Sequence, residues 1–254
     1  MPDSHTLDNR FLQVKKLVSS HIPQLDGLRG LAILWVIFHN AGFKGVNTSE
    51  GFVVKLGELF ADSGWVGVQL FFVLSGFLIT GILLEGRGSQ RQLAHFYMRR
   101  TLRIFPLYYI FLVLVFVILP IAGLMPAWLK SSQNEQIWYW FYVINWMQPF
   151  LDDIRLSHFW SLAIEEQFYI FWPLLAVFLA QRTLSMVCVG LIVSAFITRF
   201  IIIYFFPHIP TEVAYTFTLA RWDALAGGAL LAVIVRQRNF FAIVDSWWPP
   251  VAIC

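Results

Sequence analysis

Long apolar runs alternate with short polar stretches along most of the chain. A helix of about 20 residues crosses the hydrocarbon core of a bilayer, and six runs come close to that length. Such runs predict membrane-spanning helices. The expected spans are residues 28–43, 66–84, 105–125, 160–180, 184–206 and 217–235, and another apolar piece begins near Phe240.

The segment 137–150, IWYWFYVINWMQPF, fits this pattern less well. It is short and crowded with Trp and Tyr, which favour the membrane–water interface. A span, a re-entrant element and an interfacial helix all agree with its composition. We favour a partial crossing, because Arg182, Arg236 and Arg238 then lie on the cytoplasmic side, where short loops collect basic residues.

The same rule gives the orientation of the first two spans. Basic residues precede the first span and crowd the loop after the second, so we expect both regions to be cytoplasmic. These residues are Arg10, Lys15 and Lys16, and then Arg87, Arg91, Arg99, Arg100 and Arg103.

Composition supports a membrane protein. Of 254 residues, 58% are hydrophobic and 13% are charged, which lies far outside the range of soluble domains. The net charge of +3 is too small to suggest a nucleic-acid partner. Cys188 lies in an apolar run and Cys254 ends the sequence, so neither a disulfide framework nor a metal site is expected.

The pattern predicts an all-α polytopic transmembrane helix bundle. We expect a cytoplasmic N-terminal segment, residues 1–22, followed by one membrane domain, residues 23–254. Because the sequence stops at WWPPVAIC, where another hydrophobic element is beginning, we expect this domain to be incomplete at its C-terminus.

His39 is the polar residue that the first span explains least. If that helix begins near Leu28, His39 lies about 17 Å along it, past the middle of the membrane. A neighbouring helix or the far interface could simply satisfy the imidazole. The functional interpretation is a general base, because the pKa of imidazole lies near working pH. We favour the base, since intramembrane ionisable groups usually mark a function.

Further charged residues sit where apolar ones are expected. Arg100 and Arg103 are one helical turn apart, so they could set the topology or grip a phosphate. Glu165 and Glu166 point about 100° apart on a helix, so at least one of them should face protein. Arg221 and Asp223 precede a small-residue face, where an ion pair and helix packing are the simplest interpretation.

These stretches together resemble the acyltransferase-3 family of integral membrane acyltransferases, which includes bacterial O-acetylases of lipopolysaccharide and other glycans. The resemblance rests on five elements in the expected order, which cover nearly the whole chain. They are LDGLRGLAIL with a histidine downstream, FFVLSGFLIT, R-x-x-R followed by I-x-P-x-Y-Y, WSLAIEEQFY, and RWDALAGGALLA.

The resemblance implies a domain of about ten membrane helices in a bacterial inner membrane, of which this chain holds the N-terminal portion. It also implies an acyl-CoA donor, with acetyl-CoA expected, on the cytoplasmic side. The acceptor would be a hydroxyl of a polysaccharide, lipopolysaccharide or other glycolipid, and membrane lipids surround the protein. No metal is expected. Arg29 and His39 match the family's basic-residue-to-histidine motif, and Arg100 and Arg103 match its R-x-x-R.

One spacing departs from the family pattern. The motif has ten residues between the basic residue and the histidine, whereas nine separate Arg29 from His39. Nine places the two side chains about 80° apart around the helix instead of about 20°. We therefore assign the catalytic histidine more firmly than the arginine.

The expected reaction is transfer of an acyl group from a thioester to an alcohol. His39 would remove the hydroxyl proton, and Arg100 and Arg103 would hold the coenzyme A phosphates. Glu165 or Glu166 would orient or balance the imidazole. Two alternatives from other classes are a transporter or flippase that uses the buried charges as a proton relay, and an inactive sensor that binds acyl-CoA.

Overall fold

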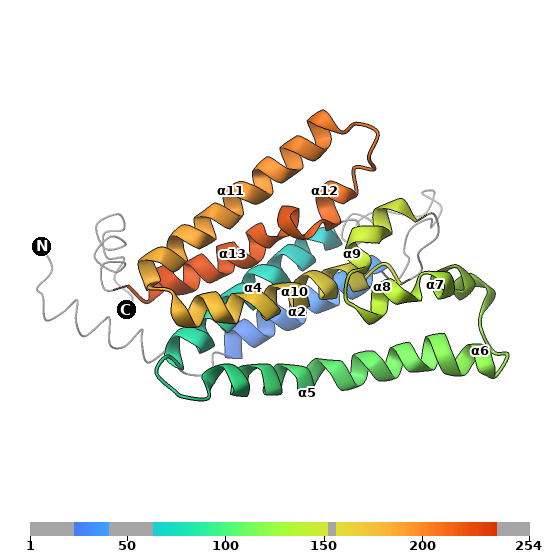
Figure 1. Ribbon diagram of the computed structural model, residues 1–254, viewed down its shortest axis with the longest axis horizontal. Coiled ribbons are helices and arrows are strands. Elements are labelled where there is room, and N and C mark those ends of the chain that lie inside the picture. Colours follow the sequence, from blue (N-terminus) through green and yellow to red (C-terminus); the bar gives the residue numbers. More distant parts are fainter. Residues whose placement is uncertain (1–22, 41–62, 152–155, 238–254) are drawn as a thin grey trace, which may run out of the picture. The chain divides into compact units, whose positions relative to one another are not determined.

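The computed structural model describes residues 23–40, 63–151 and 156–237, which form helices and turns and contain no strand. Each of the six expected spans overlaps a helix within the described residues, although the helix that covers 105–125 begins at Gln92 (Figure 1). The expected all-α polytopic bundle is therefore confirmed. The segment 1–22 and the apolar piece near Phe240 lie outside the described residues. The six helices are α2 Pro23–Asn40, α4 Gly64–Glu85, α5 Gln92–Val113, α10 Phe159–Phe178, α11 Gln181–Phe205 and α13 Thr218–Val235.

Four stretches of helix are long and apolar enough to cross a membrane. They are Gly64–Glu85, Gln92–Ile121, Gln181–Phe205 and Val213–Val235. The last includes α12, Val213–Thr216, which directly precedes α13. The helices α2 and α10 are not among the four, and these two carry His39 and the Glu165–Glu166 pair. His39 and the two glutamates therefore lie on helices outside the four, whereas Arg100, Arg199 and Asp223 lie on helices among them.

The segment 137–150 is broken into helices of three to five residues. These are α8 Gln136–Trp140, α9 Ile144–Met147 and the 3₁₀ turn η3 Gln148–Phe150. A five-residue helix is only about 7.5 Å long, so this segment does not form a single spanning helix. Two short pieces precede it, η2 Ala127–Leu129 and α7 Lys130–Asn134.

Tyr142 ends α8 in a conformation that usually belongs to glycine. Its φ of 54° is the only positive value at a non-glycine residue in the described part of the chain. The amide of Tyr142 donates to the carbonyl of Tyr139, and the amide of Val143 donates to that of Trp138. This is a Schellman C-cap, in which the left-handed residue turns the chain out of the helix.

The chain divides into two compact units, each assembled from separate stretches of sequence. The first unit contains the described residues up to Glu85, then Leu179–Val189, and the described residues from Ala224 onward. The second contains Gly86–Phe178 and Gly190–Asp223. The helices α11 and α13 thus contribute to both units.

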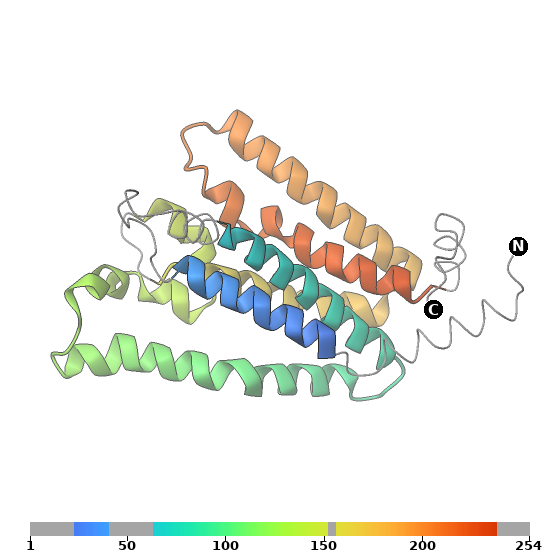
Figure 2. The same ribbon diagram turned by 180° about the vertical axis from the view of Figure 1, so that it is seen from behind.

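In the first unit, α2 and α4 lie side by side and antiparallel, as both views show (Figures 1 and 2). Glycine allows this close approach. A Cβ added to Gly67 would lie 3.0 Å from the carbonyl oxygen of Ala32, which is fully buried. Small residues are the usual means of bringing membrane helices together, because packing replaces the hydrophobic effect between them.

The helices α4 and α13 approach still more closely in the same unit. A Cβ on Gly76 would lie 1.9 Å from the carbonyl oxygen of Leu225, and one on Gly228 would lie 1.9 Å from that of Val73. The two backbones therefore touch. The helix packing expected for the small residues of RWDALAGGALLA is confirmed here, and its partner is the Ser-Gly step of FFVLSGFLIT.

The second unit is built around α5 and α10. The helix α5 continues through the π-helix η1 Leu114–Ile118 into α6 Leu119–Ile121. Pro120 lies two residues after the end of the π-helix, and a proline ring clashes with the carbonyl four residues earlier unless the helix widens or bends. The π-helix gives that widening.

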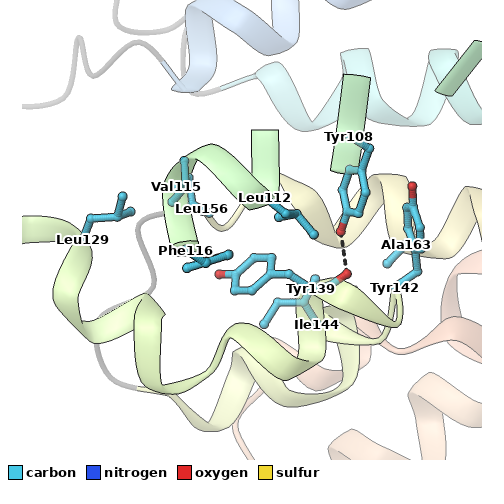
Figure 3. Close-up of a cluster of buried hydrophobic side chains, with 10 residues drawn as sticks. All are labelled: Tyr108, Leu112, Val115, Phe116, Leu129, Tyr139, Tyr142, Ile144, Leu156 and Ala163. Atoms are coloured by element: carbon cyan, nitrogen blue, oxygen red, sulfur yellow. Dashed lines mark hydrogen bonds between the residues drawn. The ribbon is translucent and has the colours of Figure 1, made fainter. Parts of the chain in front are cut away.

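A buried cluster ties the end of α5 to the broken segment and to α10 (Figure 3). The ring of Tyr108 stacks on that of Tyr142, with centroids 4.2 Å apart, and its hydroxyl donates to the carbonyl of Tyr139 at 2.7 Å. These contacts hold the strained turn in place. The other members drawn are Leu112, Val115, Phe116, Leu129, Ile144, Leu156 and Ala163.

Candidate functional site

His39 lies in the last turn of α2, half-buried, with its side chain against the first residue of α4. An idealised Cβ on Gly64 would lie 2.1 Å from the His39 Cβ, 2.5 Å from its Cγ and 3.1 Å from its Nδ1. The imidazole therefore occupies the space that a side chain at position 64 would fill. It is held against protein.

Arg29 also lies on the α4 side of α2. Its guanidinium carbon is 4.9 Å from the centre of the Phe71 ring, a cation–π contact. His39 lies ten positions after Arg29, which is about 15 Å along the helix axis. An arginine side chain cannot cover that distance, so Arg29 does not contact the imidazole. Its catalytic role stays a prediction.

Arg100 and the two adjacent glutamates form one charged cluster in the second unit. The Nη2 of Arg100 lies 3.9 Å from a Glu165 carboxylate oxygen, and its Nε lies 3.6 Å from one of Glu166. The guanidinium carbon stacks 3.5 Å from the centre of the Tyr169 ring, whose hydroxyl donates to Glu165 at 2.8 Å. The antiparallel packing of α5 on α10 brings these residues together.

The cluster is almost dry. Only 4% of the Glu165 side chain and 7% of the Glu166 side chain are exposed, against 14% for Arg100. Burying a charge costs desolvation free energy, and the attraction to the Arg100 guanidinium offsets that cost for the two carboxylates. Two carboxylates share one cation, so the cluster holds more acidic than basic groups.

The two arginines of the R-x-x-R element have different surroundings. Arg103 is exposed, whereas Arg100 is turned toward α10 and paired. The element thus supplies one arginine that ties two helices together and one that is open to a ligand. The expectation that both grip a single phosphate stays a prediction, and Arg103 is the better placed of the two.

Both glutamates take Arg100 as their partner, and Glu165 also accepts from Tyr169. Their expected part in orienting His39 stays a prediction, since the histidine belongs to the other unit.

Gln167, the next residue of the same motif, belongs to a polar network that sequence reasoning did not detect. Its amide nitrogen donates to the Tyr142 carbonyl at 2.7 Å and to the Asn145 side chain at 2.9 Å. Thr218 donates to the Gln167 side-chain oxygen and accepts from Trp146 at 2.7 Å. The side chain of Asn145, which is fully buried, donates to Thr218 at 3.0 Å. The network fastens the broken segment to α10 and α13.

The expected pair of Arg221 and Asp223 takes another form. Asp223 pairs with Arg199 of α11, which also donates to the carbonyl of Ala220. Arg221 instead lies over the Tyr215 ring at 4.2 Å and the Trp160 ring at 5.6 Å. Residues two apart on a helix point in different directions, so Asp223 reaches the neighbouring helix. This pairing also accounts for the charge of Arg199 inside an apolar helix.

The geometry therefore places the family-like motifs on paired helices in each unit, α2 with α4 and α5 with α10. A family comparison decides what they have in common, because the acyltransferase-3 family, described as an acyltransferase domain, matches residues 22–252. The chain belongs to this family.

Relatives with printed names agree with the family assignment. A peptidoglycan O-acetyltransferase OatA of Listeria monocytogenes is 35% identical over 230 residues, covering 84% of this chain and 34% of that protein. A putative peptidoglycan O-acetyltransferase YrhL of Bacillus subtilis is 32% identical, covering 86% of this chain and 34% of its own length. An O-acetyltransferase OatA of Staphylococcus aureus is 30% identical, covering 96% of this chain and 38% of that protein.

This acyltransferase-3 chain spans about a third of the length of these relatives. No solved structure matches it.

Proposed function

We propose that the protein is an O-acetyltransferase that moves an acetyl group from acetyl-CoA to a hydroxyl of a cell-envelope glycan. The observation that carries the proposal is the family match across residues 22–252, which includes both the helix with His39 and the helices with Arg100 and Glu165. The relatives are named as transferases, which favours an enzyme over the transporter or sensor alternatives.

Peptidoglycan is the acceptor to test first. Two relatives are named for peptidoglycan, and the relatives described here are not named for lipopolysaccharide. We keep lipopolysaccharide as the second acceptor. The proposed location is the bacterial plasma membrane, with the N-terminal segment and the coenzyme A side both cytoplasmic, because the basic residues between Arg87 and Arg103 precede the apolar part of α5.

The proposed chemistry needs one base and one electrophile. His39 accepts the proton of the acceptor hydroxyl while the hydroxyl oxygen attacks the carbonyl carbon of the thioester. The tetrahedral intermediate collapses, the carbon–sulfur bond breaks, and the coenzyme A thiolate leaves with the proton from the imidazolium. A half-buried imidazole packed against protein is suited to this, because its ring direction is fixed and it still reaches water.

The donor phosphates are the proposed ligand of Arg103. The guanidinium is exposed in the middle of α5, directly before the apolar run that begins at Ile104, so a charged nucleotide can bind there without entering the apolar core. Arg100 is assigned a different task, because its guanidinium is already occupied by two carboxylates. Its ion pairs keep α5 and α10 aligned with each other, one helical turn before the proposed phosphate contact at Arg103.

The test is acetyl transfer from labelled acetyl-CoA to peptidoglycan in membranes that contain the full chain. His39→Ala should lower transfer at least about 100-fold, the usual contribution of a general base. The control is Asn40→Ala, because the Asn40 side chain is exposed and, among the described residues, donates to the Val36 carbonyl of its own helix. Unchanged transfer in His39→Ala would remove the histidine from the base role. No transfer by the unmodified protein to either glycan would favour transport or sensing.

A further inference from the structure

The contact between Gly64 and His39 is too close for any residue other than glycine. Carbon atoms that are not bonded prefer separations of about 3.5–4.0 Å, whereas a Cβ at position 64 would lie 2.1 Å from the His39 Cβ. The clash is with the Cβ of His39, the first atom of its side chain. A rotamer change moves the imidazole tip and leaves the Cβ where it is, so rotation cannot relieve it. The end of α2 would have to move.

Two other contacts resist that movement. The indole Nε1 of Trp35 donates to the hydroxyl of Ser63 at 3.2 Å, one residue before Gly64. A turn deeper, a Cβ on Gly67 would already lie 3.0 Å from the Ala32 carbonyl oxygen. The two turns of α2 that precede His39 are therefore fixed to the first turns of α4, around Gly64.

Arg29 shows that the same helix pair controls both motif residues. Its contact with Phe71 lies seven residues further along α4 than Gly64, on the same face. The stripe of α2 that faces α4 thus begins with Arg29 and ends with His39. The direction of the imidazole is set by α4 as well as by α2.

We propose that Gly64 is a positioning residue for the His39 imidazole, seating the ring against the N-terminal turn of α4 so that it faces the reacting hydroxyl. This inference rests on the proposed function, in which His39 is the base. Gly64 itself touches no substrate. Its contribution is the missing side chain, which lets the ring lie directly on the helix backbone.

The first test is Gly64→Ala. Relieving a 2.1 Å approach to an ordinary contact moves the ring by roughly 1.4 Å, and a misplacement of about 1 Å can cost about 100-fold in rate. We expect kcat to fall about 100-fold with the acetyl-CoA KM changed less than about twofold, because the donor phosphates bind elsewhere. The matched control is Gly190→Ala, where an added Cβ meets nothing within 4 Å.

A double variant separates positioning from general damage. If Gly64 acts only through His39, then Gly64→Ala should cause no further loss in a His39→Ala protein, because residues that act as a unit are non-additive. Independent, multiplying losses would overturn the inference. Wild-type kcat in Gly64→Ala alongside an inactive His39→Ala would also overturn it and leave the proposed function standing.

The second test needs no activity measurement. Cysteines introduced by His39→Cys and Gly64→Cys should form a disulfide on mild oxidation in membranes, since a shift of about 1.7 Å at the end of α2 takes their Cβ atoms from 2.1 Å to the usual separation of about 3.8 Å. His39→Cys with Phe71→Cys is the control, because Phe71 lies about 10 Å further along α4. The absence of a cross-link between positions 39 and 64, or an equal yield in both pairs, would overturn the inference that His39 lies against Gly64. If the cross-link forms while His39→Ala stays active, His39 does lie against Gly64 but is not the base.

Discussion

Replacing Arg100 with methionine should destabilise the protein far more than the same change at Arg103. Methionine keeps a long unbranched side chain and removes only the guanidinium. At 3.6–3.9 Å and an effective dielectric of 20, the attraction to each carboxylate is about 4 kcal/mol before desolvation is counted. Removing one partner of a buried pair typically costs about 3–5 kcal/mol, because the remaining charge stays buried and uncompensated.

The assay is thermal unfolding of the purified protein in detergent, followed by far-UV circular dichroism. For a chain of this size a loss of 3–5 kcal/mol lowers the midpoint by roughly 10 °C. Arg103→Met should change stability by less than about 0.5 kcal/mol, since Arg103 is exposed. Adding Glu165→Gln and Glu166→Gln to Arg100→Met should recover at least half of the loss, because no buried charge remains.

Equal midpoints for Arg100→Met and Arg103→Met would refute this reasoning. So would a triple variant no more stable than Arg100→Met alone, because the damage would then come from lost packing on Tyr169 and not from uncompensated charge.

Three other outcomes follow from the contacts. Asn145→Ala should cost about 3 kcal/mol of unfolding free energy, measured by the same thermal assay, because it removes a fully buried amide from the network and leaves its partners unsatisfied. Gly76→Ala should lower the unfolding midpoint while Gly190→Ala does not, since an added Cβ at position 76 would meet the α13 backbone at 1.9 Å and one at 190 would meet open space. Arg103→Ala should raise the acetyl-CoA KM about tenfold in the transfer assay, the effect of one charge-assisted hydrogen bond, and a similar rise in the exposed control Arg91→Ala would speak against a specific phosphate contact.

The helices were predictable because the thickness of the bilayer sets their length. A run of about 20 apolar residues has few other ways to satisfy its backbone in a bilayer, and each expected span became a helix. The break inside 137–150 was not predictable, because Tyr142 ends α8 where a sequence signal would be glycine or proline. Its left-handed conformation depends on stacking against Tyr108, which lies 34 positions earlier in the chain.

The charged residues of the candidate site were identified from sequence, but their partners were not. That Glu165 and Glu166 face protein follows from helix geometry alone. That both face Arg100 depends on the antiparallel packing of α5 and α10, which no local pattern records. The role of Gly64 was equally hidden, since a glycine at the start of a helix has no side chain to signal a neighbour.

The Asn145–Gln167–Thr218 network also has a consequence for biosynthesis. Thr218 follows Gln167 by 51 residues, so at ordinary translation rates it leaves the ribosome about 3–10 seconds later. During that interval Gln167 already has the Tyr142 carbonyl and the Asn145 amide as partners. The polar side chains of Gln167 and Asn145 can therefore satisfy each other before α13 is made, and the arrival of α13 adds Thr218 to the network.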